Sequence, residues 1–277
     1  IDNLDNYIHD NRISVKDLYL QISSMGDEKP GIVEGNDLPD FNPDDEYLKE
    51  VKSPIFYAVQ KNINIQTGQP TVMEFDMQRI SQRINIIFNI RTEGNIKKED
   101  LSAPIIELSG TCGRFNISDA CLDTTRLYRT VHQVQPDEFT QTGEGTYRCA
   151  VHFHTLGIIP SAAKGHLNGP GILQVALQVS TPQLDAAGAP VLDADGNPVK
   201  NSRYIYGAIN PYDELTAAQL IEVRDGKTYL RYSKEDVNIE ITTPLVIKAD
   251  KIVPNDTGMG WQPHDPSNPD DDIIIEI

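Results

Sequence analysis

Residues 83–91, RINIIFNIR, alternate apolar and polar side chains over the full length of a strand. Successive side chains of a β-strand point to opposite faces of the sheet, so a period of two predicts one buried and one solvated face. The β-branched content of the stretch favours the same structure. The apolar set that we expect to face the core is Ile84, Ile86, Phe88 and Ile90.

The same alternation recurs along most of the chain. It is clearest in 147–155 (YRCAVHFHT), 173–180 (LQVALQVS) and 237–242 (VNIEIT). Clusters of Gly, Pro, Asn and Asp between the runs indicate turns. Helical patterning is confined to 213–223 and, more weakly, to 44–51, so the expected fold class is mainly β with antiparallel sheets. Shorter runs with period two occur at 13–22, 62–66, 71–77, 104–109, 127–134, 203–209 and 228–232.

Length and one polar segment predict two domains. A chain of 277 residues is long enough for two domains of ordinary size. The segment 135–145 (QPDEFTQTGEG) is polar, contains one proline and two glycines, and separates two strand-rich halves. We therefore expect two antiparallel β-sandwiches in tandem, the first over residues 1–137 and the second over 138–277.

A short duplication lies in the second half, where LDAAGAPV (184–191) is followed directly by LDADGNPV (192–199). Eight residues are too few for a solenoid repeat. The turn residues Gly188, Asp195 and Gly196 instead predict a long hairpin between the strands at 173–180 and 203–209.

Charge excludes two classes of partner. The formal net charge is −17, and nucleic acids and anionic membrane surfaces are bound through basic patches. We therefore expect no nucleic-acid partner. No stretch approaches the roughly 20 apolar residues of a membrane-spanning helix.

Two motifs depart from the catalytic or metal-binding patterns that they resemble. In 193–197 (DADGN), the glycine is fourth and the twelfth position is Tyr204, whereas a calcium loop needs glycine at position six and glutamate at position twelve. In 109–115 (SGTCGRF), Arg114 stands where a nucleophile elbow around Cys112 needs glycine. Both motifs are expected to be turns.

The histidines and cysteines also fail to indicate a metal site or a catalytic site. His152 and His154 share the polar face of one strand, but a catalytic metal site needs a third ligand and supporting partners. Three cysteines fit neither a zinc spacing nor a disulfide-rich scaffold. Cys149 is expected to be a small buried apolar residue, and whether Cys112 and Cys121 pair across a hairpin is left open. We expect no metal, no cofactor and no catalytic residues, hence no enzyme.

Aromatic residues suggest an alternative function. The second half contains several tyrosines and the only tryptophan, Trp261. Aromatic faces form stacking platforms for sugars, although tyrosine is also a favoured strand residue. A glycan-binding surface lipoprotein is therefore the alternative function, with Tyr204, Tyr206 and Trp261 as its candidate stacking residues.

The chain ends in NPDDDIIIEI (268–277). The pattern predicts a last strand that completes a sheet, with Ile273, Ile275 and Ile277 filling the core of the second sandwich. The preceding aspartates are expected to form a solvated turn.

Several strings together resemble the fimbrillin-type surface proteins of Bacteroidetes. These strings are 53–90 (SPIFYAVQ through RINIIFNI), 105–118 (IIELSGTCGRFNIS), 152–158 (HFHTLGI) and the terminal GWQPHDPSNPDDDIIIEI. The similarity spans most of residues 53–277 and is nearest to the minor fimbrial subunits and anchors. At Ile80 to Gln82 the chain lacks the alanine that the family carries after its arginine.

This resemblance implies two transthyretin-like sandwiches in an exported protein, held at the outer membrane by a lipid anchor upstream of this chain. It also implies a non-enzymatic role in fimbria (pilus) assembly and cell adhesion. The expected partners are other fimbrial subunits, joined by β-strand addition or by end-to-end contact.

Overall fold

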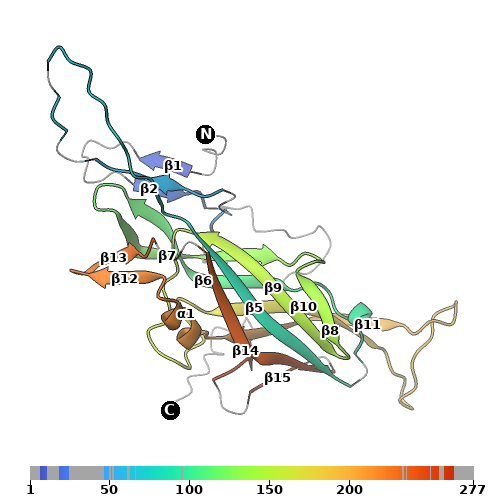
Figure 1. Ribbon diagram of the computed structural model, residues 1–277. Coiled ribbons are helices and arrows are strands. Elements are labelled where there is room, and N and C mark those ends of the chain that lie inside the picture. Colours follow the sequence, from blue (N-terminus) through green and yellow to red (C-terminus); the bar gives the residue numbers. More distant parts are fainter. Residues whose placement is uncertain are drawn as a thin grey trace.

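The computed structural model describes residues 7–10, 19–24, 47–49, 51, 53–60, 63–65, 67–94, 96–232, 234, 236–249, 251–255 and 259–264. Within these ranges the chain forms two main β-sheets that pack face to face (Figure 1), together with a separate two-stranded sheet. The described helices are α1 (Tyr212–Ala218) and the single 3-10 turn η3 (Lys98–Asp100). Neither is long and apolar enough to cross a membrane.

The large sheet has the strand order β12-β13-β7-β6-β10-β11-β16. Off this path, β2 pairs with β6, and β1 pairs with β2. All pairings in this sheet are antiparallel. Its strands are β1 (Tyr7–Asp10), β2 (Tyr19–Ile22), β6 (Ile105–Asn116), β7 (Cys121–Gln133), β10 (Leu173–Pro182), β11 (Lys200–Ile209), β12 (Ile221–Arg224), β13 (Lys227–Leu230) and β16 (Gln262–Pro263).

The small sheet has the order β15-β14-β5-β9-β8. Its central strand, β5, runs antiparallel to β9 and parallel to β14. A separate two-stranded ladder joins β3 (Phe56–Tyr57) to β4 (Gln78–Arg79). The strands of the small sheet are β5 (Gln82–Glu93), β8 (Phe139–Gly143), β9 (Thr146–Thr155), β14 (Asp236–Lys248) and β15 (Lys251–Val253).

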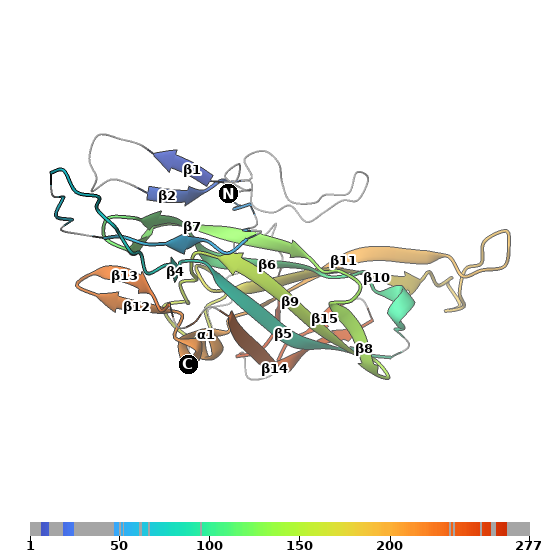
Figure 2. The ribbon, with the colours of Figure 1, turned by 45° about the horizontal axis from the view of Figure 1, so that its top comes forward.

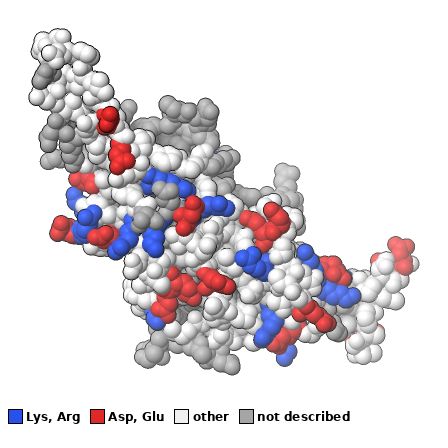
Figure 3. Space-filling view, viewed as in Figure 1, with Lys and Arg blue, Asp and Glu red and all other residues white. Residues whose placement is uncertain are grey.

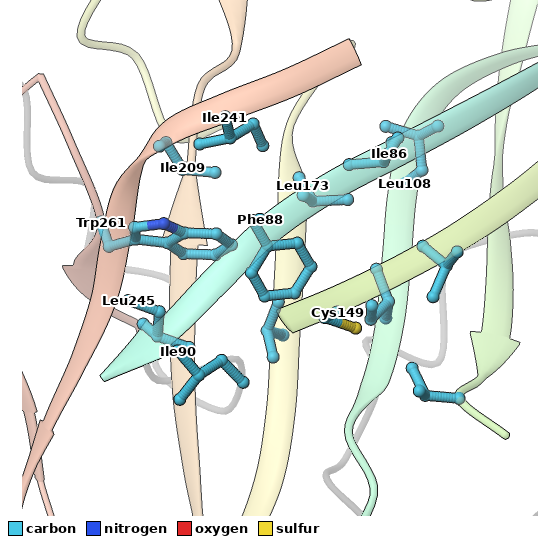
Figure 4. Packing of buried hydrophobic residues seen from close by; sticks show 14 of the residues in the cluster. Ile86, Phe88, Ile90, Leu108, Cys149, Leu173, Ile209, Ile241, Leu245 and Trp261 are labelled. Atoms are coloured by element: carbon cyan, nitrogen blue, oxygen red, sulfur yellow. The ribbon is translucent and has the colours of Figure 1, made fainter. Parts of the chain in front are cut away.

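One hydrophobic core lies between the two sheets. The four apolar residues that the period of two assigns to the core face of β5, from Ile84 to Ile90, are all fully buried. They pack with the inward residues of β9, β14 and β10, among them Cys149, Ile241 and Leu173 (Figure 4). The expected fold class, a mainly β sandwich, is confirmed. The expected antiparallel pairing holds throughout the large sheet, whereas in the small sheet β5 and β14 are parallel.

The strands do not divide into tandem sandwiches at 137/138. From the first half, β5 lies between β9 and β14 of the second half, and β6 pairs with β10. The polar segment around 135–145 is instead a hairpin, because β8 pairs with β9 inside the small sheet. The described part of the chain thus forms one sandwich with strands contributed alternately by both halves.

The second face of β6 is also covered. Nearly all of β6 is buried, because its residues Cys112 and Phe115 pack in a second cluster with Ile22, Leu48, Val51 and Tyr57. The Tyr47 hydroxyl donates a hydrogen bond of 2.7 Å to Glu107, and Glu107 also pairs with Arg129. These contacts attach the N-terminal segment to a buried carboxylate, which needs such partners.

Two expectations of helix need correction. In the range 44–51, the described residues Tyr47 and Leu48 form β-bridges with Arg129 and Ser24, so tertiary pairing overrides the weak helical pattern. In the range 213–223, the helix is α1, which ends at Ala218. Gln219 then takes a left-handed conformation as the C-cap, and the chain continues as β12.

The predicted hairpin between β10 and β11 is confirmed, and its end is built from the duplication. We call residues 183–199 the tip. Each eight-residue unit closes on its own aspartate: Asp185 accepts hydrogen bonds from the amides of residues 187 and 189, and Asp193 from those of residues 195 and 197. A ring of three backbone bonds links the units, from Gln183 to Val199, from Val199 to Val191 and from Val191 to Gln183.

Two long excursions leave the sandwich at opposite ends. One is the tip, and the other is the segment between β3 and β4, residues 58–77, which we call the arm (Figures 1 and 2). The strands expected at 62–66 and 71–77 fall in the arm. The described residues of the arm form no strand.

Candidate interaction site

The base of the arm is fixed to the sandwich. Phe56 pairs with Arg79 and Tyr57 with Gln78, so the chain leaves and returns at one place. The Tyr57 hydroxyl donates a hydrogen bond of 2.6 Å to the carbonyl of Ile117, and its ring meets Phe115 edge-on at 5.3 Å. The arm is therefore held at its root by buried contacts.

Beyond this base the arm is exposed and apolar. The described residues include twelve exposed large hydrophobic side chains, and eight of them lie on the arm or its first base strand. Val72 is 85% exposed and Ile65 is 75% exposed. Apolar side chains gathered on a protruding segment mark an interaction surface or a membrane-contact site. The eight are Phe56, Val59, Ile63, Ile65, Val72, Met73, Phe75 and Met77.

The arm also has strand patterning without a strand partner. Between residues 71 and 77, apolar side chains are interleaved with Glu74 and Asp76. A connection of 20 residues whose described part has no strand or helix is unusual in a compact domain, and such loops commonly bind a partner or a ligand. Extended segments with free backbone groups bind by adding to a sheet or by inserting side chains into a pocket.

Charge is sparse on the arm. Among its described residues only Glu74 and Asp76 are charged, and the space-filling view shows the arm largely free of coloured side chains (Figure 3). The remainder of the visible face carries mixed positive and negative groups. A surface with few charges costs little free energy to desolvate, so the apolar part of this segment suits burial against a partner.

A pocket lies at the base of the tip, where β10 ends and β11 begins. Its volume is about 520 Å³, within the range of ligand pockets. The ends of β5 and β14 and the turn η3 supply the other walls. We call this cavity the tip pocket; its walls include Ile96, Thr181, Pro182, Pro198, Lys248 and Ala249.

Of the candidate sugar-stacking residues, only Tyr204 and Tyr206 come together, and Trp261 lies apart from them in the core. Trp261 is 1% exposed, donates a hydrogen bond of 3.0 Å from Nε1 to the carbonyl of Thr243, and packs 5.2 Å from Phe88 in the core (Figure 4). It therefore presents no face to a ligand. Tyr204 and Tyr206 are half-buried and stacked, with ring centroids 6.3 Å apart and an interplanar angle of 19°. They point away from the core because Ile205 between them points into it.

The C-terminal candidates lie outside the described residues. Ile273, Ile275 and Ile277 follow His264, the last residue that the structure describes. The nearest described element is β16, which pairs with β11 at Gly207 and Ala208.

The histidines on β9 have separate partners. His154 Nδ1 lies 2.8 Å from the carbonyl oxygen of Val51, and His152 Nδ1 lies 3.5 Å from Glu138 Oε1. Glu138 Oε2 also lies 2.7 Å from His132 Nε2. The described residues contain no group of three or more histidines, cysteines or carboxylates that is placed to hold a metal ion.

The open question of the cysteines is resolved. Cys112, Cys121 and Cys149 are all free and buried. Burial raises the pKa of the Cys112 and Cys149 thiols to about 12 in each case. Such thiols are inert at neutral pH because the reactive form is the thiolate.

We expect the protein to lose stability as the pH falls below about 6.5, the usual pKa of histidine. Burial and then the positive charge of Arg83 lower the pKa of His152, and they outweigh the opposing effect of Glu138; His132 and His154 lower it further. Because the unfolded chain then binds the proton at a higher pH, acid favours unfolding. Melting temperatures between pH 5 and 7.5 measure this effect.

His152→Gln is the matched control for that measurement. It removes the titrating ring, so the slope of melting temperature against pH should decrease. Direct observation of the His152 ring by NMR should show a pKa below 6.5. A value above 6.5 would contradict the prediction.

The fold and the arm define a β-sandwich protein with a protruding, apolar segment. Neither a family model nor a curated protein matches the sequence. A crystal structure from Bacteroides ovatus, of a protein described as a "putative adhesin", is similar with a TM-score of 0.43 and 8% sequence identity. The match covers 90% of this chain and 72% of that chain. At this identity and TM-score, the likeness assigns neither a family nor a function.

Proposed function

We propose that the chain is a non-enzymatic structural protein of the bacterial cell surface, a minor subunit or an anchor of a fimbria that acts in assembly and adhesion. The arm is the observation that carries this proposal, because it offers an apolar, strand-patterned segment to a partner. The resemblance of residues 53–90 and 105–118 to fimbrillin-type proteins supports it independently. Export and a lipid anchor upstream of the chain belong to the same proposal.

Energetics favour assembly as the role of the arm. Fully burying one large apolar side chain contributes about 1.5–3 kcal/mol. Association costs about 4–15 kcal/mol in lost translational and rotational freedom. The eight side chains are between 43% and 85% exposed, so burying them together contributes a free energy of the same order as that cost. Without a partner they would favour aggregation.

The proposal predicts that polar substitutions on the arm abolish incorporation into surface fibres. Phe75→Asp combined with Met77→Asp should leave the melting temperature within about 2 °C of the parent chain, because neither residue lies in the core. In the producing strain, the amount of this protein in sheared and purified fimbriae should fall at least about tenfold, which is the effect of 1.4 kcal/mol. Cell adhesion should fall with it.

Val223→Asp is the matched control. Val223 is also exposed, but it lies on β12 and not on the arm. It should enter fimbriae as the parent chain does. Normal incorporation of the arm variant would refute the proposed function, as would equal losses in the arm variant and the control.

Glycan binding is a second candidate function, favoured by the stacked pair Tyr204 and Tyr206. Their outward rings lie across from Gln178 and Ala176 of β10, and amide side chains beside aromatic faces suit sugar hydroxyls. A glycan array decides between the candidates. Binding that is lost in Tyr204→Ala combined with Tyr206→Ala, but is kept in the arm variant, would favour glycan recognition.

A further inference from the structure

We infer that the arm of one copy docks in the tip pocket of a second copy, so that copies of this chain join head to tail. The inference rests on the proposed function and names the partner of the arm. The arm and the base of the tip would then form the two complementary sides of one interface.

The placement of the two surfaces determines the kind of assembly. The arm and the tip project from opposite ends of the sandwich in both views (Figures 1 and 2). The tip pocket lies at the tip end, because its walls include Ser180, Pro182 and Lys200. A contact between two different surfaces of one chain is heterologous, and it continues from copy to copy unless its rotation closes a ring. Opposite ends favour an open linear array, which for a minor subunit is a short run of copies within or at the end of a fimbria.

The two surfaces match in chemistry. The arm presents side chains such as Phe75 and Met77, which are about half exposed. The tip pocket has apolar walls from Ile96, Pro182 and Ala249 and is large enough for side chains of this size. Both surfaces lose apolar exposure on docking, which is the main favourable contribution to association.

The charges at the two surfaces are also complementary. Three carboxylates of the tip pocket already pair within their own chain: Glu93 with Arg91, Glu99 with Lys97 and Asp100 with Lys200. Lys248 is the pocket cation that makes no ion pair among the described residues.

The arm carries the opposite charge beside its apolar side chains. Glu74 and Asp76 flank Phe75 and make no described ion pair. When Phe75 is seated, these carboxylates lie near the rim of the pocket, within reach of the long, flexible Lys248 side chain.

A second copy is favoured over a basic or neutral partner because one chain supplies both complementary surfaces. Each copy carries a net charge of −17, so two copies repel each other in most orientations. Lys248 lowers this repulsion at the tip pocket. Since salt screens the long-range repulsion, the array should form more readily at 0.5 M than at 0.05 M sodium chloride.

Cysteine cross-linking tests the docking directly. Phe75→Cys places a thiol on the arm, and Thr181→Cys places one at the tip pocket. The native cysteines are buried and free, so they should contribute little. A disulfide forms only when the two Cα atoms approach within about 7 Å. Under mild oxidation, a mixture of the two single variants should give a covalent dimer, and a chain that carries both cysteines should give a ladder of oligomers.

Three comparisons keep the test specific. Phe75→Cys mixed with Val223→Cys should cross-link at least about tenfold less than Phe75→Cys mixed with Thr181→Cys. Lys248→Glu in the Thr181→Cys chain should lower the yield. Glu74→Lys combined with Asp76→Lys in the Phe75→Cys chain should restore it.

Two results would overturn the inference. Equal yields with Thr181→Cys and Val223→Cys would show random collision. Efficient cross-linking of Phe75→Cys alone would show exchange between two arms. If either occurs while polar arm variants are still lost from fimbriae, the proposed function stands with another partner. If the polar arm variants are incorporated normally, the proposed function itself fails.

Discussion

Replacing Phe88 by alanine is expected to lower the free energy of unfolding by about 3–5 kcal/mol, the usual cost of removing a buried phenylalanine. Phe88 is fully buried, faces Cys149 across one strand pair and Ile241 across the other, and packs 5.2 Å from Trp261. These contacts come from three segments far apart in the sequence. The substitution therefore opens a cavity at the place where both halves of the chain meet.

Calorimetry of Phe88→Ala measures the effect and also tests the shared core. At about 2–4 °C per kcal/mol for a chain of this size, the melting temperature should fall by about 6–20 °C. Because strands of both halves share each sheet, the sandwich should unfold in one transition that moves as a whole. Two transitions, of which only one moves, would indicate independent tandem domains.

Ile65→Ala is the control for this prediction. Ile65 is 75% exposed on the arm, and substitutions of exposed residues away from special features usually change stability by less than about 0.5 kcal/mol. Its melting temperature should match that of the parent chain. A large loss of stability in Ile65→Ala would place the arm in the folded core.

Gly110→Ala is expected to cost about 2–5 kcal/mol. Gly110 lies at a bulge in β6 with φ +81°, a conformation that costs a residue with a side chain about 1–2 kcal/mol. An added Cβ would also lie 2.6 Å from the backbone nitrogen of Gly171 and 2.7 Å from the carbonyl oxygen of Ile159. Forcing atoms into such a packed site costs a further 1–3 kcal/mol, roughly.

Gly188→Ala separates the cost of the positive φ from the cost of crowding around an added Cβ. Gly188 has the same φ of +81°, but nothing lies within 4 Å of an added Cβ. Its cost should be limited to about 1–2 kcal/mol. Denaturant titration of both variants gives the difference, which measures crowding at the bulge. Equal losses would show that the contacts around Gly110 relax without cost.

The strands could be predicted from the sequence because alternation reports which side chains are buried. For β5, β9 and β10 the predicted core faces are the observed ones. Alternation does not report which other strands of the chain pair with a given strand. The partners of β5 are about 60 and 150 residues away in the chain, so the sharing of sheets between the two halves could not be predicted.

The arm shows the same limit of sequence-based prediction, because its strand pattern does not identify the strand that would pair with it. Residues 71–77 have the pattern of a strand, and that pattern is identical whether the partner belongs to this chain or to another molecule. Only the structure shows that no strand of the described chain pairs with them. Trp261 is a related case, because an aromatic residue near a chain end can lie in a core or on a surface. Its contact with Phe88 decides in favour of the core.

Because the tip consists of two equivalent eight-residue units, its length could change by one whole unit at a time. Val191 and Val199 hold equivalent places at the ends of the two units, and both bond within the ring that starts at Gln183. Loss of residues 192–199 would let Val191 take the place of Val199 opposite Gln183, which leaves an ordinary hairpin. The pairing of β10 with β11 would be unchanged. Gain or loss of a whole unit would thus change how far this end extends while keeping the sandwich intact.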